Sequence, residues 1–575
     1  MQAIVSCNNF SYAYPSASRL ALLDLNFEIL PGSFNVICGP SGAGKSTLCK
    51  ALAGIVPNYY GGGYKGSIEI LNNNTLNRNI ADLALEVGIV LDDYESQLVS
   101  LTVEEELSFA LLNRQLPAAQ IAATIPEVLA AVGLAGRENY QLDELSGGQR
   151  QRLVIASVIA TKPKILVLDE PVSALDPEGA VALYQVINSL RAKYNITVIV
   201  VEHNLNYVLP YMENLLIMQD AQLVHCGDLN SSLQFMFNTP SLNLLLPELS
   251  KVQLLLNQQA PLNFSQWRTA PQAIQELSNC LATSTIQGNY LAPSYQAAQT
   301  PPLLDLQAVN FAYRTGEPIL KDINLTVHQG EFIALLGQNG SGKTTLSRLL
   351  MALNKARSGK ITFQNQDTAN FEPADLADKI GYVFQNPDLQ ILADTVFEEV
   401  AYGARLKGYS ETELTELVNQ ALIATGLKHL AQAYPRTLSF GQKRRLGIAA
   451  ALVLKPQILI LDEITSGQDN LEKALIMNYL AKLNRAENLT IILITHDMPT
   501  VLQYASRVLT LKQGEVVFDG GVAELFSGAQ PLGEWGLRLP SIVQLGNYFK
   551  LPNNSANNFA PAFVNLLTGG ELDAK

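Results

Sequence analysis

The sequence predicts an α/β fold in which two tandem domains each have a mostly parallel sheet covered by helices. Two observations support this prediction. First, residues 145–176 align without a gap to residues 438–469, with 17 identities in 32 positions, so the chain contains an internal repeat. Second, short β-branched segments such as SFNVICG (33–39) and KILVLDE (164–170) alternate with helical stretches, which is typical of a parallel sheet between helices.

The repeat also sets the expected domain boundaries. The two copies are offset by 293 residues in this region and by 298 residues further upstream, so the first copy holds five extra residues, which we place near 58–66. Each repeated domain is followed by a short helical appendage. The expected segments are a first domain over 1–235, an appendage and linker over 236–301, a second domain over 302–525, and an appendage and tail over 526–575.

The segment between the domains has the composition of a linker. From Val252 to Pro301 only Arg268 and Glu276 are charged, and Gln, Ser, Thr, Ala and Pro are frequent. This composition predicts an extended tether, although the apolar residues of APQAIQELSNCLA (270–282) are also compatible with a small helix. We expect the tail after Leu551 to be weakly ordered.

The composition excludes several classes of protein. With 48% hydrophobic and 16% charged residues the chain is too apolar for a disordered protein. It has no apolar run near the roughly 18 residues of a membrane helix and no signal or transit peptide, so we expect a cytoplasmic protein. A net charge of −13 argues against nucleic acid or an anionic lipid surface as the main partner. The five cysteines show no paired spacing, which favours reduced thiols over disulfides or a zinc site.

A glycine-rich loop lies between a strand and a helix in each copy. Residues 39–47 read GPSGAGKST and residues 337–345 read GQNGSGKTT, and both fit the pattern G-x-x-x-x-G-K-[ST]. Glycines there let consecutive backbone N–H groups face a polyphosphate, and the helix N-terminus adds partial positive charge. We expect Lys45 and Lys343 to hold the β- and γ-phosphates.

These loops predict a nucleotide bound with Mg²⁺, with the hydroxyls of Ser46 and Thr344 as metal ligands. The residues expected to contact nucleotide in the two loops are Gly39, Ser41, Gly42, Gly44, Lys45, Ser46 and Thr47, and Gly337, Asn339, Gly340, Gly342, Lys343, Thr344 and Thr345.

An acidic pair ends a predicted buried strand in each copy. Asp169 and Asp462 stand at the carboxyl end of the strand, where open α/β sheets hold ligands, and can reach Mg²⁺. The adjacent Glu170 and Glu463 can polarise a water for attack on a γ-phosphate. Such a pair seen alone is usually a turn. Its recurrence in both copies, 23 residues after the serine of an LSxGQ element, favours the catalytic interpretation.

Two of the five histidines, His203 and His496, recur at the repeat offset, each directly after a predicted strand. A lone histidine is more often a structural residue. Recurrence beside a phosphate site favours contact with the γ-phosphate and the attacking water.

The ordered set of glycine-rich loop, LSGGQ, acidic pair and histidine resembles the ABC-type ATPases over nearly all of both halves. The resemblance implies P-loop nucleotide-binding domains, each with a helical subdomain, that hydrolyse ATP. In that family two such domains sit head to tail, and the signature of one caps the ATP held by the other. The signature residues implied to contact ATP are Ser146, Gly147, Gly148 and Gln149 in the first domain, and Ser439, Gly441 and Gln442 in the second.

The same resemblance assigns further positions. Tyr12 in FSY and Tyr313 in FAY are implied to stack on adenine, although an aromatic residue there can equally be a packing residue. Ser173–Asp176 and Ser466–Asp469 resemble the D-loops that couple the two sites. Gln385 resembles the Q-loop glutamine, which touches Mg²⁺ or water and leads into the surface that meets the transporter.

The two ATP sites are expected to differ. The second loop pairs with the intact LSGGQ, whereas the first pairs with LSFGQ, in which Phe440 replaces a glycine. Asp92 stands at the position of Gln385, and a carboxylate about 5 Å from a phosphate charge costs on the order of 3 kcal/mol unless Mg²⁺ offsets it. We therefore expect the first site to bind ATP but to turn over more slowly. Because Glu170 is retained, we do not expect an inactive site.

Three segments resemble the ATPases of energy-coupling factor importers: GIVPNYYGG (54–62), VFQNPDLQILADTVFEEVAYG (383–403) and GLRLPSIVQLGNYF (536–549). This resemblance implies a peripheral protein on the cytoplasmic side of the cell membrane, which serves vitamin or trace-nutrient uptake. The implied partners are an integral membrane T component and a substrate-binding membrane component, with no nucleic acid and no direct lipid insertion. Alternatives are a fused sugar or cobalt/nickel importer ATPase, or a soluble ribosome-associated ABC protein, which would be expected to carry a basic linker.

Overall fold

The computed structural model describes residues 2–15, 17, 19–173, 175–260, 264–281, 300, 302–313, 316–465, 468, 470–552 and 555–568. The chain divides into two compact units, one of Met1–Thr283, Asp469–Leu471 and Ala560–Lys575, and one of Ser284–Gln468 and Glu472–Phe559. Each unit contains one copy of the repeat. Among the described helices, none combines the length and the apolar character needed to cross a membrane.

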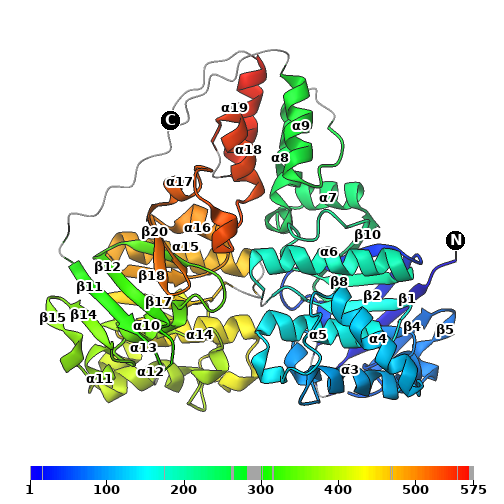
Figure 1. Ribbon diagram of the computed structural model, residues 1–575, viewed down its shortest axis with the longest axis horizontal. Coiled ribbons are helices and arrows are strands. Elements are labelled where there is room, and N and C mark those ends of the chain that lie inside the picture. Colours follow the sequence, from blue (N-terminus) through cyan, green and yellow to red (C-terminus); the bar gives the residue numbers. More distant parts are fainter. Residues whose placement is uncertain are drawn as a thin grey trace. The chain divides into compact units, whose positions relative to one another are not determined.

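The first unit contains a 4-stranded antiparallel sheet of order β2-β1-β4-β5 and a 6-stranded sheet of order β10-β9-β3-β8-β7-β6 (Figure 1). All neighbours in the larger sheet are parallel except β9 and β10, which confirms the predicted mostly parallel sheet. The strands are β1 (Val5–Ala13), β2 (Leu22–Ile29), β3 (Phe34–Cys38), β4 (Gly63–Ile70), β5 (Asn73–Asn74), β6 (Val87–Val90), β7 (Ile165–Asp169), β8 (Thr197–Val201), β9 (Asn214–Gln219) and β10 (Gln222–Asp228).

The second unit repeats this topology, with sheets of order β12-β11-β14-β15 and β16-β17-β18-β13-β19-β20. The strands are β11 (Pro302–Phe311), β12 (Leu320–His328), β13 (Phe332–Leu336), β14 (Ser358–Phe363), β15 (Gln366–Asp367), β16 (Ile380–Val383), β17 (Ile458–Asp462), β18 (Thr490–Ile494), β19 (Arg507–Lys512) and β20 (Glu515–Gly521).

Helices follow the same order in both copies. Those of residues 45–280 are α1 (Lys45–Leu52), α2 (Ile80–Leu83), α3 (Val103–Leu112), α4 (Ala118–Ala131), α5 (Gly147–Ala160), α6 (Pro177–Tyr194), α7 (Leu229–Asn238), α8 (Glu248–Gln259) and α9 (Ala270–Cys280). Those of residues 343–568 are α10 (Lys343–Leu350), α11 (Pro373–Leu376), α12 (Val396–Leu406), α13 (Glu411–Ala424), α14 (Phe440–Leu452), α15 (Asn470–Glu487), α16 (Met498–Tyr504), α17 (Val522–Leu525), α18 (Ser541–Phe549) and α19 (Ala556–Thr568).

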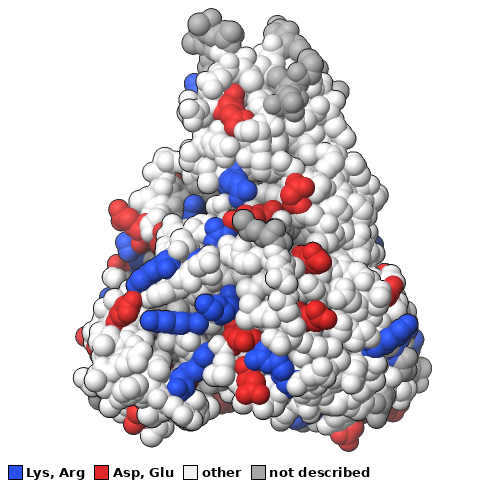
Figure 2. All heavy atoms as spheres, turned by 90° about the vertical axis from the view of Figure 1, so that its right-hand side faces the viewer, with Lys and Arg blue, Asp and Glu red and all other residues white. Residues whose placement is uncertain are grey.

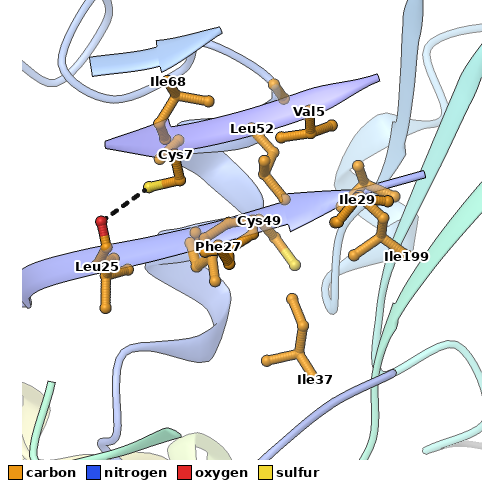
Figure 3. Packing of buried hydrophobic residues seen from close by; sticks show 14 of the residues in the cluster. Val5, Cys7, Leu25, Phe27, Ile29, Ile37, Cys49, Leu52, Ile68 and Ile199 are labelled. Carbon is orange, nitrogen blue, oxygen red and sulfur yellow. Dashed lines mark hydrogen bonds between the residues drawn. The ribbon is translucent and has the colours of Figure 1, made fainter. Parts of the chain in front are cut away.

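A buried core holds the start of α1 in place. Cys49 and Leu52 of α1 pack with Phe27 of the antiparallel sheet and with Ile37 and Ile199 of the larger sheet (Figure 3). Because β3 is buried along its whole length, the glycine-rich loop that joins it to α1 is anchored at both ends. In each unit a separate apolar core joins α3, α4 and α5, or α12, α13 and α14, which is the predicted helical subdomain.

The appendage of the first domain is more ordered than a tether. The segment 270–280 forms α9, as the alternative prediction allowed, and Trp267 is fully buried with its indole N–H donating to Glu276 Oε2 at 3.0 Å. The predicted tether over 282–299 lies outside the described residues.

On the face drawn in Figure 2, acidic and basic side chains are interspersed, and the upper part is mostly uncharged.

The expectation of a weakly ordered tail after Leu551 is wrong for residues 556–568. This segment forms α19, in which Phe559 and Phe563 are fully buried. Aromatic side chains at this spacing share one face of a helix, and their burial compensates for the ordering of a segment rich in asparagine.

Candidate functional site

The two glycine-rich loops have the same conformation. Gly39 and Gly337 adopt φ of 148° and 144°, and a Cβ atom at Gly39 would lie 2.0 Å from the carbonyl oxygen of Met218. Lys45 Nζ donates to the carbonyl oxygens of Gly39 and Pro40 at 2.9 Å. Its counterpart Lys343 makes the equivalent pair of hydrogen bonds at 2.7 and 2.9 Å. Each loop thus curls around the ammonium group of its own lysine, at the N-terminus of α1 or α10.

The first domain offers a carboxylate suited to a divalent cation. Asp169, the last residue of β7, is fully buried, and neither of its carboxylate oxygens has a hydrogen-bond partner among the described residues. Burial raises the pKa of Asp169 to about 7, the Ser46 hydroxyl lowers it, and the charges of Asp92 and Glu170 raise it. Two buried, unpaired oxygens beside a hydroxyl fit the oxygen ligands that Mg²⁺ prefers.

The corresponding carboxylate of the second domain has a hydrogen-bond partner. Asp462 Oδ2 accepts a hydrogen bond from the Tyr382 hydroxyl at 2.7 Å. Burial raises the pKa of Asp462, the hydrogen bond from Tyr382 lowers it, and the charge of Glu463 raises it. In the first domain Ile89 occupies the position of Tyr382, so Asp169 lacks the equivalent partner.

Each acidic pair contributes a glutamate that faces the predicted histidine. Glu170 Oε1 lies 2.7 Å from His203 Nε2, and Glu463 Oε1 lies 2.9 Å from His496 Nε2. The structure therefore brings together residues that are 33 positions apart in each copy. At this distance His496 Nε2 still forms no hydrogen bond to a described residue, so in the second domain the two groups are close without a shared proton.

Both glutamates have left-handed backbone conformations, with φ of 50° for Glu170 and 49° for Glu463. Each backbone N–H is held by the neighbouring strand, at 3.1 Å from the carbonyl oxygen of Val201 and at 2.9 Å from that of Ile494. Such a conformation is unfavourable for a residue with a side chain and persists where the surroundings impose it. With this conformation each carboxylate lies beside the histidine that follows the neighbouring strand.

The second glutamate has additional polar neighbours. Gln385 Nε2 donates to Glu463 Oε2 at 3.0 Å. Burial alone would raise the pKa of Glu463, but His496, Lys343 and Arg444 together lower it below its ordinary value. In the first domain the same position after β6 holds Asp92, which is exposed. The second domain thus has the neutral donor Gln385 at the position where the first domain has the carboxylate of Asp92.

The signature segments begin helices α5 and α14. The Ser146 hydroxyl accepts from the Gln149 backbone N–H at 3.4 Å, and Gln149 Oε1 accepts from the Ser146 backbone N–H at 3.0 Å. Ser439 and Gln442 form the same reciprocal capping box. Gln149 and Gln442 thus stabilise the first turn of their helices through these caps. The N-terminus of each helix is formed by the capping serine and the first turn, which includes Gly147 and Gly148 in α5 and Gly441 in α14.

The assignment of Tyr12 as an adenine contact disagrees with the structure. Tyr12 is fully buried, and its hydroxyl donates to the carbonyl oxygen of Gly61 at 2.7 Å. The positive φ of Asn9 and Ala308 marks equivalent irregularities in β1 and β11, so the true offset here is 299 residues.

With this offset, the counterpart of Tyr313 is Tyr14, which sequence reasoning missed. The Tyr14 hydroxyl lies 3.3 Å from Thr47 Oγ1, and Thr345 hydrogen-bonds the Tyr313 hydroxyl. The repeated dipeptide Ala13-Tyr14 and Ala312-Tyr313 is the signal that identifies it. Of the predicted D-loops, Ala174 in the first and Ser466, Gly467 and Asp469 in the second lie outside the described residues.

A buried carboxyl group beside His203 predicts a pH-dependent stability. Glu202 accepts a hydrogen bond from the Tyr184 hydroxyl, and burial raises the pKa of Glu202 to about 8. The folded chain therefore binds a proton that the unfolded chain releases near its ordinary pKa. We expect the free energy of unfolding to fall as pH rises from about 5 to 8, by at most about 1.4 kcal/mol per pH unit.

Urea unfolding at several pH values tests this expectation. E202Q should make the fall less steep and leave the part that comes from the raised pKa of Asp169, and E95Q, at an exposed position, should retain the full fall. An identical pH dependence in E202Q and the unchanged chain would show that Glu202 is ionised in the folded state.

Comparisons with known proteins place this site in a family. The family model for ABC transporters matches residues 22–173 and 320–466. A putative ABC transporter ATP-binding protein of Methanosarcina acetivorans is 36% identical over 557 residues, which cover 94% of this chain and 89% of the relative. One of the same description from Lactiplantibacillus plantarum is 36% identical over 576 residues, or 98% of both chains. The solved structure of cbiO1 from Clostridium perfringens, part of the ABC transporter complex cbiONQ, is 37% identical over 42% of this chain and 98% of that chain, with a TM-score of 0.38.

Proposed function

Because the chain belongs to the ABC transporter family of ATP-binding proteins, we propose that it energises a membrane importer of the energy-coupling factor type, for a vitamin or trace nutrient. It is an ATPase with two nucleotide-binding domains in one chain. The proposed domains keep the boundaries 1–235 and 302–525. ATP binding draws these domains together and hydrolysis releases them, as the resemblance implies.

The residues of each domain have distinct parts in hydrolysis. The loop N–H groups and Lys45 or Lys343 bind the phosphates, and Glu170 or Glu463 orients the attacking water and takes up its proton. The histidine paired with each glutamate holds that carboxylate in place and can contact the γ-phosphate.

A metal site is proposed in each domain. The residues that would hold Mg²⁺ are Asp169 and Ser46 in the first domain and Asp462, Thr344 and Gln385 in the second. When bound, Mg²⁺ supplies positive charge that offsets the charge of the phosphates. The buried, unpaired oxygens of Asp169 support this assignment in the first domain.

One observation carries the proposal of membrane coupling. The segment after Asp92 or Gln385, with the helix that follows it, exposes large apolar side chains in both domains, and we name these two patches the coupling surfaces. They comprise Val99, Leu101, Phe109 and Leu112 in the first domain, and Leu389, Leu392, Tyr402 and Leu406 in the second. Phe109 and Tyr402 are counterparts at the 293-residue offset and are 50% and 48% exposed.

Apolar side chains exposed together mark a binding site for another protein more often than side chains exposed singly. We propose that the coupling surfaces bind the integral membrane T component, which places the chain at the cytoplasmic side of the membrane. A substrate-binding membrane component completes the complex. The short acidic and apolar sequence of these surfaces offers no basic cluster for nucleic acid.

Affinity purification from detergent-solubilised native membranes, followed by mass spectrometry, tests this function. We expect the tagged chain to recover an integral membrane protein of T type together with a small substrate-binding membrane protein. Recovery of only a sugar-type or cobalt/nickel transporter would change the importer class. Recovery of ribosomes without a membrane partner would contradict the proposal.

The corrected tyrosine position gives a prediction on nucleotide affinity. We expect Y14A to weaken binding of a non-hydrolysable ATP analogue at the first site about tenfold, because an aromatic face is lost. Y14F should bind nearly as tightly as the unchanged chain. Isothermal titration calorimetry measures both. Y12A serves as a contrast, since truncation of a fully buried aromatic residue should lower stability by about 3 to 5 kcal/mol.

A further inference from the structure

Arg444 of α14 is a buried cation whose position no motif explains. It is 3% exposed, and its guanidinium carbon lies 4.5 Å from the centre of the Phe440 ring, one helical turn earlier. Its Nη1 donates to the carbonyl oxygen of Ile464 at 2.9 Å. Ile464 directly follows Glu463, so the guanidinium holds the peptide next to the catalytic carboxylate.

This hydrogen bond restrains a backbone that needs support. Glu463 has a φ of 49°, and its N–H is held at 2.9 Å by the carbonyl oxygen of Ile494. Arg444 holds the carbonyl group of the next residue, Ile464. The backbone thus has a fixed partner at the Glu463 N–H and another at the Ile464 carbonyl oxygen, and these two hydrogen bonds restrain the position of the carboxylate.

The charges of Arg444 and Glu463 also favour each other. Burial lowers the pKa of Arg444 to about 10, while the charge of Glu463 raises it. Arg444 is also among the groups that lower the pKa of Glu463. A guanidinium with this pKa stays charged at neutral pH and can keep its hydrogen bond to the Ile464 carbonyl oxygen.

The first domain lacks both members of this pair. Gly147 stands at the position of Phe440 and Gln151 at that of Arg444. Gln151 is 1% exposed, and its Oε1 has no hydrogen-bond partner among the described residues. The aromatic ring and the cation therefore occur together in one domain and are both replaced in the other. The Phe440 ring that contacts the guanidinium is 45% exposed, whereas Arg444 is 3% exposed.

We propose that Arg444 is a positioning residue for Glu463, and that Phe440 covers its guanidinium. The replacement of a signature glycine by Phe440 then has a function within its own domain: it shields the cation that orients the general base. The proposal rests on the ATPase activity of the chain. It does not depend on the importer type or on any membrane partner.

The test uses the full-length chain in an E170Q background, so that turnover reports the second site. R444Q introduces the residue that the first domain carries. We expect kcat for ATP to fall about tenfold with KM changed less than twofold. R444K keeps a cation that can donate to the Ile464 carbonyl oxygen but loses the planar contact with the Phe440 ring, so its kcat should fall less than that of R444Q.

Two outcomes would overturn the proposal. One is an R444Q variant that folds, as judged by its thermal unfolding midpoint, and has the kcat of its parent. The other is an R444K variant whose kcat falls as much as that of R444Q. If R444Q does not fold, R444K and F440G decide. F440G should lower kcat two- to threefold, and an F440G variant with the kcat and KM of its parent would contradict the role of the ring.

Discussion

E463Q should lower the ATP turnover of the chain at least about 100-fold, whereas E170Q should lower it less than about fivefold. Removal of a general base typically costs a factor of 10² to 10⁴. Glu463 has the fuller set of partners, since His496 faces one carboxylate oxygen and Gln385 donates to the other. We therefore expect the second site to carry most of the turnover, so that only its loss should remove most of the rate.

Asp92 provides the physical reason for a slower first site. An additional carboxylate next to the phosphate position opposes the charge that develops there, although its exposure to solvent screens part of the effect. In an E463Q background, D92Q, which introduces the residue of the second domain, should raise the remaining turnover several-fold. D93N, at the next exposed position, is the matched control.

Steady-state phosphate release by the purified chain measures all four variants. If E170Q impaired hydrolysis as severely as E463Q, the two sites would contribute equally and the assigned difference between them would be wrong. A D92Q variant with no gain over its E463Q parent would remove Asp92 as the cause.

The double variant F109E/Y402E should abolish co-purification with the membrane partner. A carboxylate at each position would have to be desolvated against an apolar partner surface, at a cost of several kcal/mol. Because both side chains are about half exposed in the isolated chain, the fold and basal ATP hydrolysis should change less than twofold. Pull-down from solubilised membranes and phosphate release measure the two effects.

V224E is the control for added charge, since Val224 is an apolar residue of β10 that is 38% exposed outside the coupling surfaces. It should co-purify as the unchanged chain does. Undiminished recovery of the membrane partner with F109E/Y402E would show that the coupling surfaces are not where the partner binds.

The pairing of each glutamate with its histidine could be predicted because the chain repeats these residues. Glycine-rich loops, acidic pairs and histidines recur at fixed spacing, and the fold brings Glu170 to His203 and Glu463 to His496 within 2.9 Å. Each of these glutamates and histidines follows the end of a strand, and both the strand and the residue can be recognised in the sequence.

The tyrosine position could not be predicted in the same way. Aromatic residues occur at every second position in Phe10, Tyr12 and Tyr14, so an alignment shifted by two residues keeps the same strand face. The repeated dipeptide Ala13-Tyr14 and Ala312-Tyr313 is the one signal for the correct register, and the backbone irregularity at Asn9 agrees with it. Its consequence is that Tyr12 is buried and Tyr14 lies beside the loop.

The buried contacts of Trp267 and of Arg444 were missed for a different reason. Low charge over 252–281 indicated a linker, but neutral groups satisfy each other there: Gln253 accepts from the Trp267 backbone N–H at 3.1 Å and donates to the carbonyl oxygen of Phe264 at 3.3 Å. Arg444 contacts a carbonyl group twenty residues away. Nothing in the sequence indicates which backbone oxygen a buried arginine will reach.

Site-specific photo-crosslinking in intact cells tests most directly that this ATPase acts on membrane subunits. A photoreactive residue is placed at Phe109 or at Tyr402, and at Val224 as the control position. The account predicts ultraviolet-dependent crosslinks from both coupling surfaces to one integral membrane protein, and none from position 224. Crosslinks from 109 and 402 to ribosomal proteins, or to no membrane protein at all, would contradict it.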